Sequence, residues 1–572
     1  MAGLHLADLS AVAVYFVIIV AVGVWSARRV TSLDDFVMPR RFGKVFMIFF
    51  TFGAGTHSDQ AVSVASKTYT NGVSGIWYQW LWLFASPFYW LIAPMMRRFR
   101  ALTTADVFEL RFNRSVAMLY AVVSLALYSV NIGVMLKGSS AVIDATTGGS
   151  VNAEWAIALM TVLFVVYGVA GGLGAAIITD FLQGVLTIFF SFLLLPYIFH
   201  AVGGMEGLQQ SVPQAAPDRN MFSLVAPEDI GLFYIIVIAL NALVGIVTQP
   251  HTMGNCAAGR TELDGQVGFM CGSLIKRVCT IAWCLTGLAA VAYFADTEIH
   301  PDKVFGQVAR DILPGVMPGM LGLFIAGLLA SVMSSCDAFM VSSAGLFAEN
   351  LYKPLAPGRS PRHYLWVARL SSLVVVVGGV AFAYWVEDVV KGLEIFWKIS
   401  PMLGVAFWLG LFWRRMTSAG AWAATLAALG TWWLSAQSLV IEWIAGCPAA
   451  ESLRLVVEAD GEKALYLPWQ MVFYLGAGLV SGVVVSLLTP SVNEKKLERY
   501  FALIRTPIQP SEVIPAPCTL PKGVQVPPRR MLVSAWGLEI PMPSTQAIFG
   551  FLVGWVCVAA IIGAFIWIVQ GC

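Results

Sequence analysis

The chain has 572 residues, of which 58% are hydrophobic and only 12% are charged, with a formal net charge of +2 and a mean hydropathy of +0.77. This composition excludes an ordinary soluble domain and predicts an all-α polytopic membrane protein. Nine cysteines without a CxxC or Cys/His cluster give no support to a metal or thiol-redox centre. The chain also has no GxxxxGK phosphate loop, which argues against an ATP-driven pump.

Apolar runs long enough to cross a bilayer as helices recur along the whole chain. We predict about 14 transmembrane helices, near residues 8–27, 45–66, 74–96, 115–144, 153–170, 174–200, 229–251, 268–295, 318–348, 363–386, 392–413, 417–445, 466–489 and 545–569.

The connections between these spans differ in charge, and the difference predicts the orientation. Most Lys and Arg residues fall in alternate connections, for example Arg40, Arg41 and Lys44, then Arg97, Arg98 and Arg100, then Arg414 and Arg415, then Lys495, Lys496 and Arg499. Basic connections stay in the cytoplasm. We therefore expect a multi-pass protein of the cell membrane (plasma or inner), with both termini outside.

Two spans are interrupted by polar or helix-breaking residues. The second span carries Gly53 to Asp59 in its middle, and the seventh carries Pro250, which removes a backbone donor. Irregular backbone at membrane depth survives only where it faces protein or a wet cavity. Paired interruptions of this kind indicate the central site of a transporter.

The ninth span, within Leu321–Asn350, carries a stripe of small polar residues. Ser331, Ser334, Ser335 and Ala338 share one helical face, with Asp337 at its edge. Serine hydroxyls in membrane helices often bond only to a carbonyl one turn back. A carboxylate at membrane depth, however, costs roughly 2.5–3.5 kcal/mol and usually marks an ion or substrate path. We interpret this helix as one wall of a cation site, because hard cations prefer oxygen ligands.

These features divide the chain into consecutive segments. We expect an extra helix and loop (1–44), a first five-span block (45–200), an outer loop with a short surface helix (201–228), a second block (229–413), peripheral helices (414–489), an irregular cytoplasmic proline-rich tether (490–544) and a last transmembrane helix (545–572).

Five motifs resemble the sodium:solute symporter family in order and spacing. They are SLDDFVMPRRFG after the first span, GGLGAAIITDFLQG in the sixth, QPHTMGNCAAGRT after the seventh, ASVMSSCDA in the ninth and LGLFWRR at the end of the eleventh. The resemblance implies a LeuT-type fold with a 5+5 inverted repeat, alternating access, and coupling of solute import to sodium.

The resemblance also implies cation ligands. The main sodium site would use the backbone carbonyls of Ala54, His57 and Ser331 and the hydroxyls of Ser334 and Ser335. A second cation, sodium or a proton, would lie among Asp180, Ser334, Asp337 and the carbonyl of Ala338. The alternative is that Asp180 only bonds to hydroxyls of the ninth span. Asp337 stands where a neutral residue is common in the family.

The solute is harder to infer. Candidate solute-binding residues are Ser58, Gln79, Asn241, Gln249 and His251. The sequence lacks the aromatic residues, glutamate and glutamine of sugar-binding relatives: Val244 and Gly245, Gln79 and Leu393 stand in their places. The triplet Gln249-Pro250-His251 is instead similar to the proline, pantothenate and monocarboxylate branches. A small organic or amino acid is therefore favoured over a sugar.

Three alternatives remain open at this point: a proton-coupled carrier, a sodium/sugar symporter, and a membrane sensor that keeps the symporter fold. We expect no enzymatic activity, because no nucleophile, base or metal cluster stands out at a span end. The expected partners are a small-molecule solute, the sodium ion and the lipid bilayer, without nucleic acid. The sequence does not indicate an oligomeric state.

Overall fold

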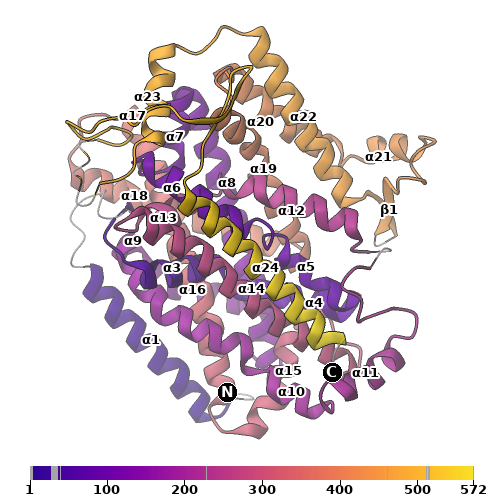
Figure 1. The fold of residues 1–572 in the computed structure, drawn as a ribbon. Coiled ribbons are helices and arrows are strands. Elements are labelled where there is room, and N and C mark those ends of the chain that lie inside the picture. Colours follow the sequence, from indigo (N-terminus) through magenta and orange to yellow (C-terminus); the bar gives the residue numbers. More distant parts are fainter. Residues whose placement is uncertain are drawn as a thin grey trace.

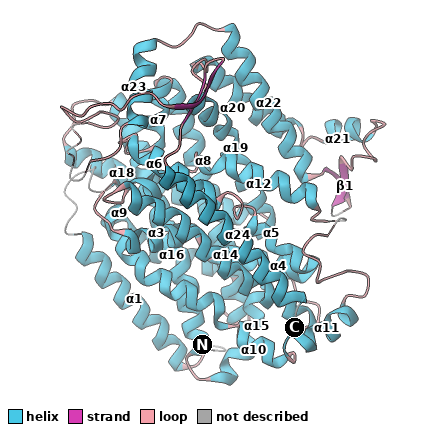
Figure 2. Ribbon diagram, viewed as in Figure 1, coloured by secondary structure: helices cyan, strands magenta, loops and turns pink. Residues whose placement is uncertain are grey.

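The computed structural model describes residues 4–27, 37–38, 40–226, 229–459, 461–509, 512, 514 and 516–570. Within this part the molecule is a bundle of helices with two small β-hairpins, and helices make up most of the drawn chain (Figures 1 and 2). Residues 28–36, which belong to the predicted first cytoplasmic loop and to the first family motif, lie outside the described residues.

The elements follow the chain in three groups. The first contains α1 (Leu6–Ala27), α3 (Lys44–Gly55), α4 (Ser58–Asn71), the 3-10 turn η1 (Gly72–Ile76), α5 (Trp77–Trp80), α6 (Ser86–Arg98), α7 (Thr104–Arg111), α8 (Arg114–Thr146), α9 (Ala153–Leu193), α10 (Leu195–Ala201) and α11 (Gly204–Ala215). The second contains α12 (Leu232–Ile246), α13 (Thr252–Ala257), α14 (Glu262–Tyr293), η2 (Pro301–Lys303), α15 (Val304–Val316), α16 (Met320–Leu346), the π-helical turn η3 (Phe347–Tyr352), α17 (Lys353–Leu355), α18 (Pro361–Trp385) and α19 (Val389–Phe412). The third contains α20 (Ser418–Leu434), α21 (Ser438–Ala445), β1 (Val456–Ala459), β2 (Glu462–Leu465), α22 (Leu467–Leu488), α23 (Glu494–Arg505), β3 (Met531–Ala535), β4 (Leu538–Pro541) and α24 (Thr545–Gln570).

Helix α16 lies at the centre of the bundle, where α1, α3, α8, α9 and α18 pack around it. The whole of its most apolar stretch is buried inside the protein. A helix that is apolar on every side must be covered on every side. The three serines and Asp337 therefore lie in the interior of the molecule and do not face lipid.

Among the described residues, eight helices are long and apolar enough to cross a membrane, or nine if α20 and α21, bent by 79°, form one span. This confirms a multi-pass helical membrane protein. The number of about 14 spans stays a prediction, because several predicted spans consist of shorter helices. The span predicted at 74–96 is one of these: η1, α5 and α6 divide it.

Helix α9 covers the predicted span 153–170 and most of the predicted span 174–200 without an assigned break, and α10 covers the end of the second span. Its two ends nevertheless lie at one face of the bundle. The carbonyl of Glu154 accepts a hydrogen bond from Tyr384, near the end of α18, and the ring of Phe190 packs edge to face against Phe305, beside η2. The segment after α18 contacts η2 directly, because the backbone N–H of Val389 donates to Asp302.

Both predicted interruptions are present as helix breaks. Thr56 and His57 adopt extended backbone between α3 and α4. Residues 247–251 separate α12 from α13. Each break leaves carbonyl groups of the preceding helix without their usual helical donors. Side chains of neighbouring helices and turn contacts supply donors instead, and these donors define the centre of the molecule.

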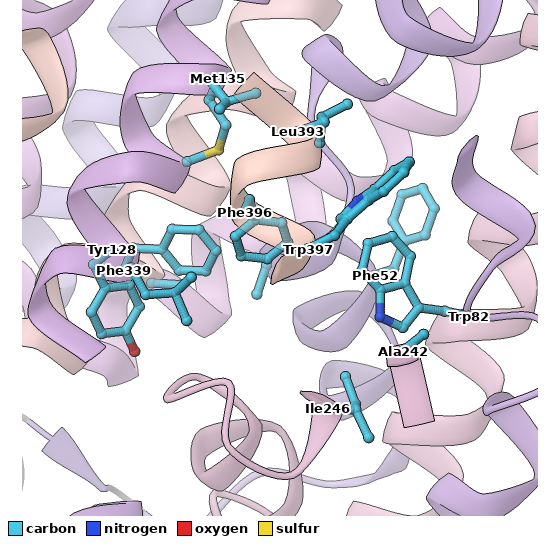
Figure 3. Packing of buried hydrophobic residues seen from close by; sticks show 14 of the residues in the cluster. Phe52, Trp82, Tyr128, Met135, Ala242, Ile246, Phe339, Leu393, Phe396 and Trp397 are labelled. Carbon is cyan, nitrogen blue, oxygen red and sulfur yellow. The ribbon is translucent and has the colours of Figure 1, made fainter. Parts of the chain in front are cut away.

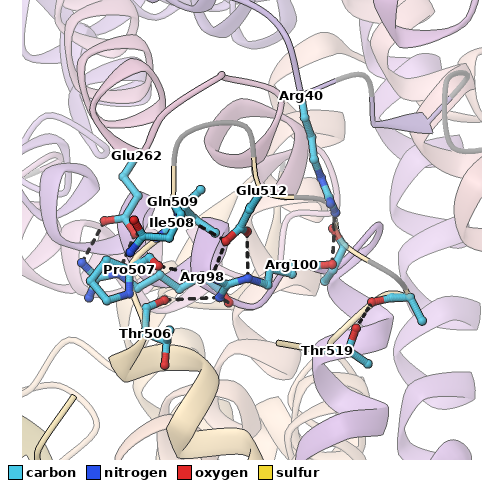
Figure 4. Close-up of polar contacts among 12 residues, drawn as sticks. Arg40, Arg98, Arg100, Glu262, Thr506, Pro507, Ile508, Gln509, Glu512 and Thr519 are labelled. Carbon is cyan, nitrogen blue, oxygen red and sulfur yellow. Dashed lines mark hydrogen bonds and ion pairs between the residues drawn. The ribbon is translucent and has the colours of Figure 1, made fainter. Parts of the chain in front are cut away.

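The segment predicted as an irregular tether is more ordered than expected. It contains helix α23 and the β3–β4 hairpin, because residues 494–505 have a strong amphipathic pattern and Leu538 begins a paired strand. The segment packs on the basic face of the bundle (Figure 4). Arg100, whose side chain is 0% exposed, forms two hydrogen bonds of 2.8 and 2.9 Å with the carboxylate of Glu512 and also donates to the carbonyls of Thr506 and Pro507.

Neighbouring arginines fasten the same face. Arg98 forms a bidentate pair with Glu262, at the start of α14, and donates to the carbonyl of Ile504. Arg111 of α7 donates to the carbonyls of Gly410 and Trp413. Burial lowers the pKa of Arg111 to about 10, so the side chain keeps its charge at neutral pH. Planar guanidinium groups suit such multiple contacts to carbonyls and carboxylates.

Candidate functional site

The first helix break lies against the serine stripe of α16. The hydroxyl of Ser335 donates to the carbonyl of Gly53 at 2.8 Å, and the hydroxyl of Ser334 donates to Asp180 of α9 at 2.5 Å. The hydroxyl of Ser331 bonds back to Leu328 within α16. The stripe therefore joins α3, α9 and α16 at one point, with the predicted ligand Ala54 buried beside it.

Gly53 permits this approach because it has no side chain. A Cβ atom at Gly53 would lie 2.5 Å from the hydroxyl oxygen of Ser334 and 3.4 Å from the Cβ of Asp180. The contact with Ser334 is closer than real Cβ atoms tolerate, so a larger residue at Gly53 would push α3 away from α16. The same glycine thus borders both predicted cation positions.

Asp180 and Asp337 leave carboxylate oxygens without hydrogen-bond partners in the buried interior. Both oxygens of Asp337, which is 2% exposed, and one oxygen of Asp180, which is 0% exposed, have no partner among the described residues. An unpaired carboxylate is strongly unfavourable when it is removed from water. A hard cation or a proton would satisfy these oxygens, and carboxylate and hydroxyl oxygens are ligands that sodium accepts. The donor set thus fits sodium.

A cavity of about 60 Å3 lies where the two helix breaks face each other. Its wall includes Ala54, Gly55 and His57 from the first break and Gln249 and His251 from the second. That volume holds only a few water molecules. A solute with several heavy atoms therefore requires the surrounding helices to move apart.

Aromatic side chains cover one side of this cavity. Trp82 lies 6.2 Å from Trp397 and 6.5 Å from Phe396 of α19, measured between ring centroids. Figure 3 shows these three rings close together, with Ile246 of α12 below them. Tyr78 extends the cluster, since its hydroxyl donates to Glu394 at 3.0 Å and its ring lies 5.1 Å from Trp397.

Two cationic residues of α14, Lys276 and Arg277, reach the cavity wall. The ammonium group of Lys276 donates to the carbonyl of Gly55 at the first break and lies 5.5 Å from the ring of Trp82. Arg277 donates to the carbonyl of Gln79, while its Nε is buried without a partner. Within the described part, the cavity wall contains these two cations and no carboxylate.

The sequence analysis missed both residues, although the signal was present. Lys276 and Arg277 are adjacent charges inside the apolar run predicted as the eighth span. Ionisable residues within a membrane span are functional candidates by default. Trp82, Gln60 and Asn255 also line the cavity, and nothing in their local pattern distinguishes them from packing residues.

The predicted solute-binding residues divide into two groups. Gln249 and His251 line the cavity, and the ring of His251 lies 5.1 Å from Phe339. Asn241 does not line it: the Asn241 amide donates to the carbonyl of Trp397 and accepts from Tyr474. Ser58 is also outside the wall and bonds to Ser139 at 2.5 Å.

Gln79 is buried with neither amide atom bonded, although it does not line the cavity. Near the first break, His57 pairs with Asp59 through Nδ1 and contacts Gln60 through Nε2 at 3.1 Å. The side chain of His57 is thus already engaged. That leaves the backbone carbonyl of His57 for the role that the sequence predicts, although it also accepts from the N–H of Gln60 at 3.1 Å.

Comparison with known proteins identifies the family. Residues 36–428 match the model of the sodium:solute symporter family. The chain belongs to this family. Sodium is therefore its coupling ion, and the chain is an integral, multi-pass transport protein.

Relatives with different solutes match the chain at similar levels. It is 26% identical to the osmoregulated proline transporter OpuE of Bacillus subtilis over 441 residues, covering 73% of this chain and 86% of the relative. It is 23% identical to sodium/glucose cotransporter 4 of Danio rerio over 548 residues, covering 87% and 81%. The relatives of this symporter thus include both amino-acid and sugar carriers.

The fold is similar to that of a Na+-coupled sialic acid symporter solved in a substrate-bound, outward-open state. The TM-score is 0.67 at 17% identity, and the match covers 86% of this chain and 99% of the other. This likeness confirms the symporter fold that the sequence motifs predicted.

Proposed function

We propose that the protein is a sodium-coupled symporter that imports a small carboxylate-bearing solute by alternating access. The observation that carries the proposal is the cavity at the paired breaks, whose wall has Lys276 and Arg277 but no carboxylate among the described residues. Among the described residues neither cation forms an ion pair with a carboxylate, and a buried cation of this kind favours an anionic ligand. The apolar remainder of the wall, including Trp82 and Phe396, suits a short carbon skeleton.

For the main sodium site, we propose oxygen ligands from the carbonyls of Ala54, His57 and Ser331 and the hydroxyls of Ser334 and Ser335. The contact between Ser335 and Gly53 supports this location, because it brings a hydroxyl of α16 to the last turn of α3. Sodium binding here would hold α3 and α16 together. Loss of sodium would remove that link and free α3 to move.

For a second cation, we propose a position among Asp180, Ser334, Asp337 and the carbonyl of Ala338. The buried, unpartnered oxygens of the two aspartates support it. A sodium ion there would add to the driving force: one charge moving across about 100 mV contributes roughly 2.3 kcal/mol. A proton at the same carboxylates is the alternative, and it would make transport sensitive to pH.

We further propose the membrane arrangement predicted from the sequence. It comprises about 14 spans, with blocks 45–200 and 229–413 as an inverted repeat and both termini outside. The helix breaks support the repeat, because each opens one block. The concentration of arginines on the face that packs against residues 494–541 supports a cytoplasmic assignment for that face.

Counterflow into proteoliposomes, with and without sodium, tests the function directly. The radiolabelled panel would contain short monocarboxylates, proline, pantothenate and glucose. We expect sodium-dependent exchange of a carboxylate and none of glucose. Sodium-dependent exchange of glucose alone would contradict the proposed solute class. If the protein exchanges none of these compounds, with or without sodium, the result would favour a membrane sensor.

A further inference from the structure

A second cavity, separate from the central one, lies on the outer side of the helix bundle. It has a volume of about 630 Å3 and lies between α6, α12, α19 and α22, with Leu538 of β4 at one end. We call it the apolar groove and define it by Met95, Leu243, Trp408, Phe412, Gly476 and Leu479. Figure 1 shows α22 and α12 side by side, with α19 adjacent.

The walls of the apolar groove present almost no polar groups to a ligand. All of the lining residues are apolar or glycine. The two indole N–H groups in the wall are already used: Trp408 donates to the carbonyl of Val244 and Trp413 to the carbonyl of Trp536, both at 3.2 Å. Water needs two or more polar partners to occupy a cavity. The occupant must therefore be apolar.

The groove follows the helices and is continuous with the lipid-facing surface. Its lining on α19 runs from Val405 to Phe412, eight residues or about 12 Å of helix. On α22, Leu479 belongs to the lining and is 48% exposed, and its neighbour Val480 is 62% exposed. An elongated furrow along the helix axes suits an extended chain and not the flat contact of a second protein.

We propose that the apolar groove binds one acyl chain of a bilayer phospholipid. The acyl chain enters the groove from the membrane leaflet on the side of Arg98 and Arg414 and extends toward the break between α12 and α13. Burial of methylene groups adds little to the stability of such a complex, because the alternative environment of the acyl chain is bulk lipid, which is as apolar as the groove. Shape complementarity therefore decides the selectivity.

The position of the groove gives the bound chain a specific effect. The carbonyl of Val244 is in the last turn of α12, where helical donors are missing, and Trp408 of α19 supplies the donor. Gly404 makes this approach possible, since a Cβ there would lie 2.1 Å from the same carbonyl oxygen. An acyl chain packed on Trp408 stabilises this contact and thereby the break of the seventh span.

Photo-crosslinking tests the proposal on the full-length protein in phosphatidylcholine nanodiscs. The probe is phosphatidylcholine with a diazirine near the end of one acyl chain, and labelled peptides are located by mass spectrometry. We expect labelling on α19 and α22 at groove residues. A probe with its diazirine on the headgroup should not label them.

Gly476 provides a blocking variant, because a Cβ atom there meets nothing within 4 Å. Gly476→Phe should fill the groove and reduce acyl-chain labelling of groove peptides at least fivefold. Gly430→Phe is the matched control: Gly430 lies in α20, outside the groove, and has equally open surroundings. Both changes replace a helical glycine, which favours the helix. Leu479→Trp, at the mouth, gives a second obstruction.

Equal labelling of groove peptides in the parent, Gly476→Phe and Leu479→Trp proteins would overturn the proposal. Labelling confined to exposed residues such as Val480 would overturn it as well. A disulfide between two copies of a Leu479→Cys protein would assign the groove to a second protomer instead. These readouts do not depend on transport, so the proposed function and this site can fail separately.

Discussion

The hydroxyl of Ser335 donates a 2.8 Å hydrogen bond to the carbonyl of Gly53, across 282 residues of sequence. The contact links the middle of α16 to the end of α3, where the first break begins. A hydroxyl can rotate so that its lone pair faces a cation, while the carbonyl already presents an oxygen. Two oxygens at this position suit the coordination sphere proposed for the main sodium site, and a change at Ser335 is the sharpest test of that proposal.

Ser335→Ala should therefore raise the sodium concentration for half-maximal uptake. Loss of one interaction with a charged group, worth about 1.5 kcal/mol, corresponds to about a tenfold increase. Ser331→Ala is the matched control, because its hydroxyl bonds only to Leu328 in the same helix and its proposed ligand is the carbonyl. Sodium titration of solute uptake measures both. An unchanged sodium dependence in Ser335→Ala would mean that the site lies elsewhere.

Asp180→Asn should remove the second cation without unfolding the protein, because the amide can still accept the hydrogen bond from Ser334. If that cation is sodium, the Hill coefficient for sodium should fall toward one. If it is a proton, the pH dependence of uptake should disappear. Asp337→Asn should reproduce the same change. A well-folded Asp180→Asn protein that retains both properties of the parent would reduce Asp180 to a packing role.

Lys276→Met should weaken the uptake of an anionic solute, because the ammonium group at the cavity wall is lost. A charge-assisted hydrogen bond worth about 1.5–3 kcal/mol corresponds to about a 10- to 100-fold increase in KM. Lys276→Arg keeps the charge and should recover part of the affinity. Lys391→Met, at an exposed position near the start of α19, controls for a general charge effect. A similar KM in all four proteins would exclude Lys276 from solute binding.

Glu512→Gln should lower the thermal stability, because it leaves the fully buried guanidinium of Arg100 without its charge partner. The remaining carbonyl contacts limit the loss to about 1–3 kcal/mol. Differential scanning fluorimetry in detergent measures the change. Replacement of the exposed Glu458 by Gln serves as the control, and the double change Arg100→Met and Glu512→Leu should restore part of the stability.

Periodicity and composition allowed much of the fold to be predicted. The apolar runs predict α8, α16, α18, α19, α22 and α24 to within a few residues, because a bilayer imposes length and polarity on each span. The positions of both helix breaks were predicted from glycine and proline residues within the spans. Order within residues 494–541 was missed, because its contacts are long-range pairs such as Arg100 with Glu512, which local patterns do not reveal.

The candidate site shows the same division. The contacts of Ser334 and Ser335 with other helices could be expected, since a polar stripe on an apolar helix needs partners, while their role as sodium ligands stays a prediction. The directions of individual side chains could not be predicted. Asn241 bonds to Trp397 and Tyr474 and does not line the cavity, whereas Lys276 reaches the first break. These directions depend on how α12, α14 and α19 pack against one another.

The segment between α22 and α24 also offers a way to determine which face of the molecule meets the cytoplasm. It is fastened to the bundle at Arg100, yet its turn at Lys522 and Gly523 is exposed and has no neighbour within 4 Å of a Cβ atom at Gly523. A short epitope inserted in this turn would leave the ion pair intact. Antibody staining of intact cells and of permeabilised cells would then report directly on which side of the membrane the arginine-rich face lies.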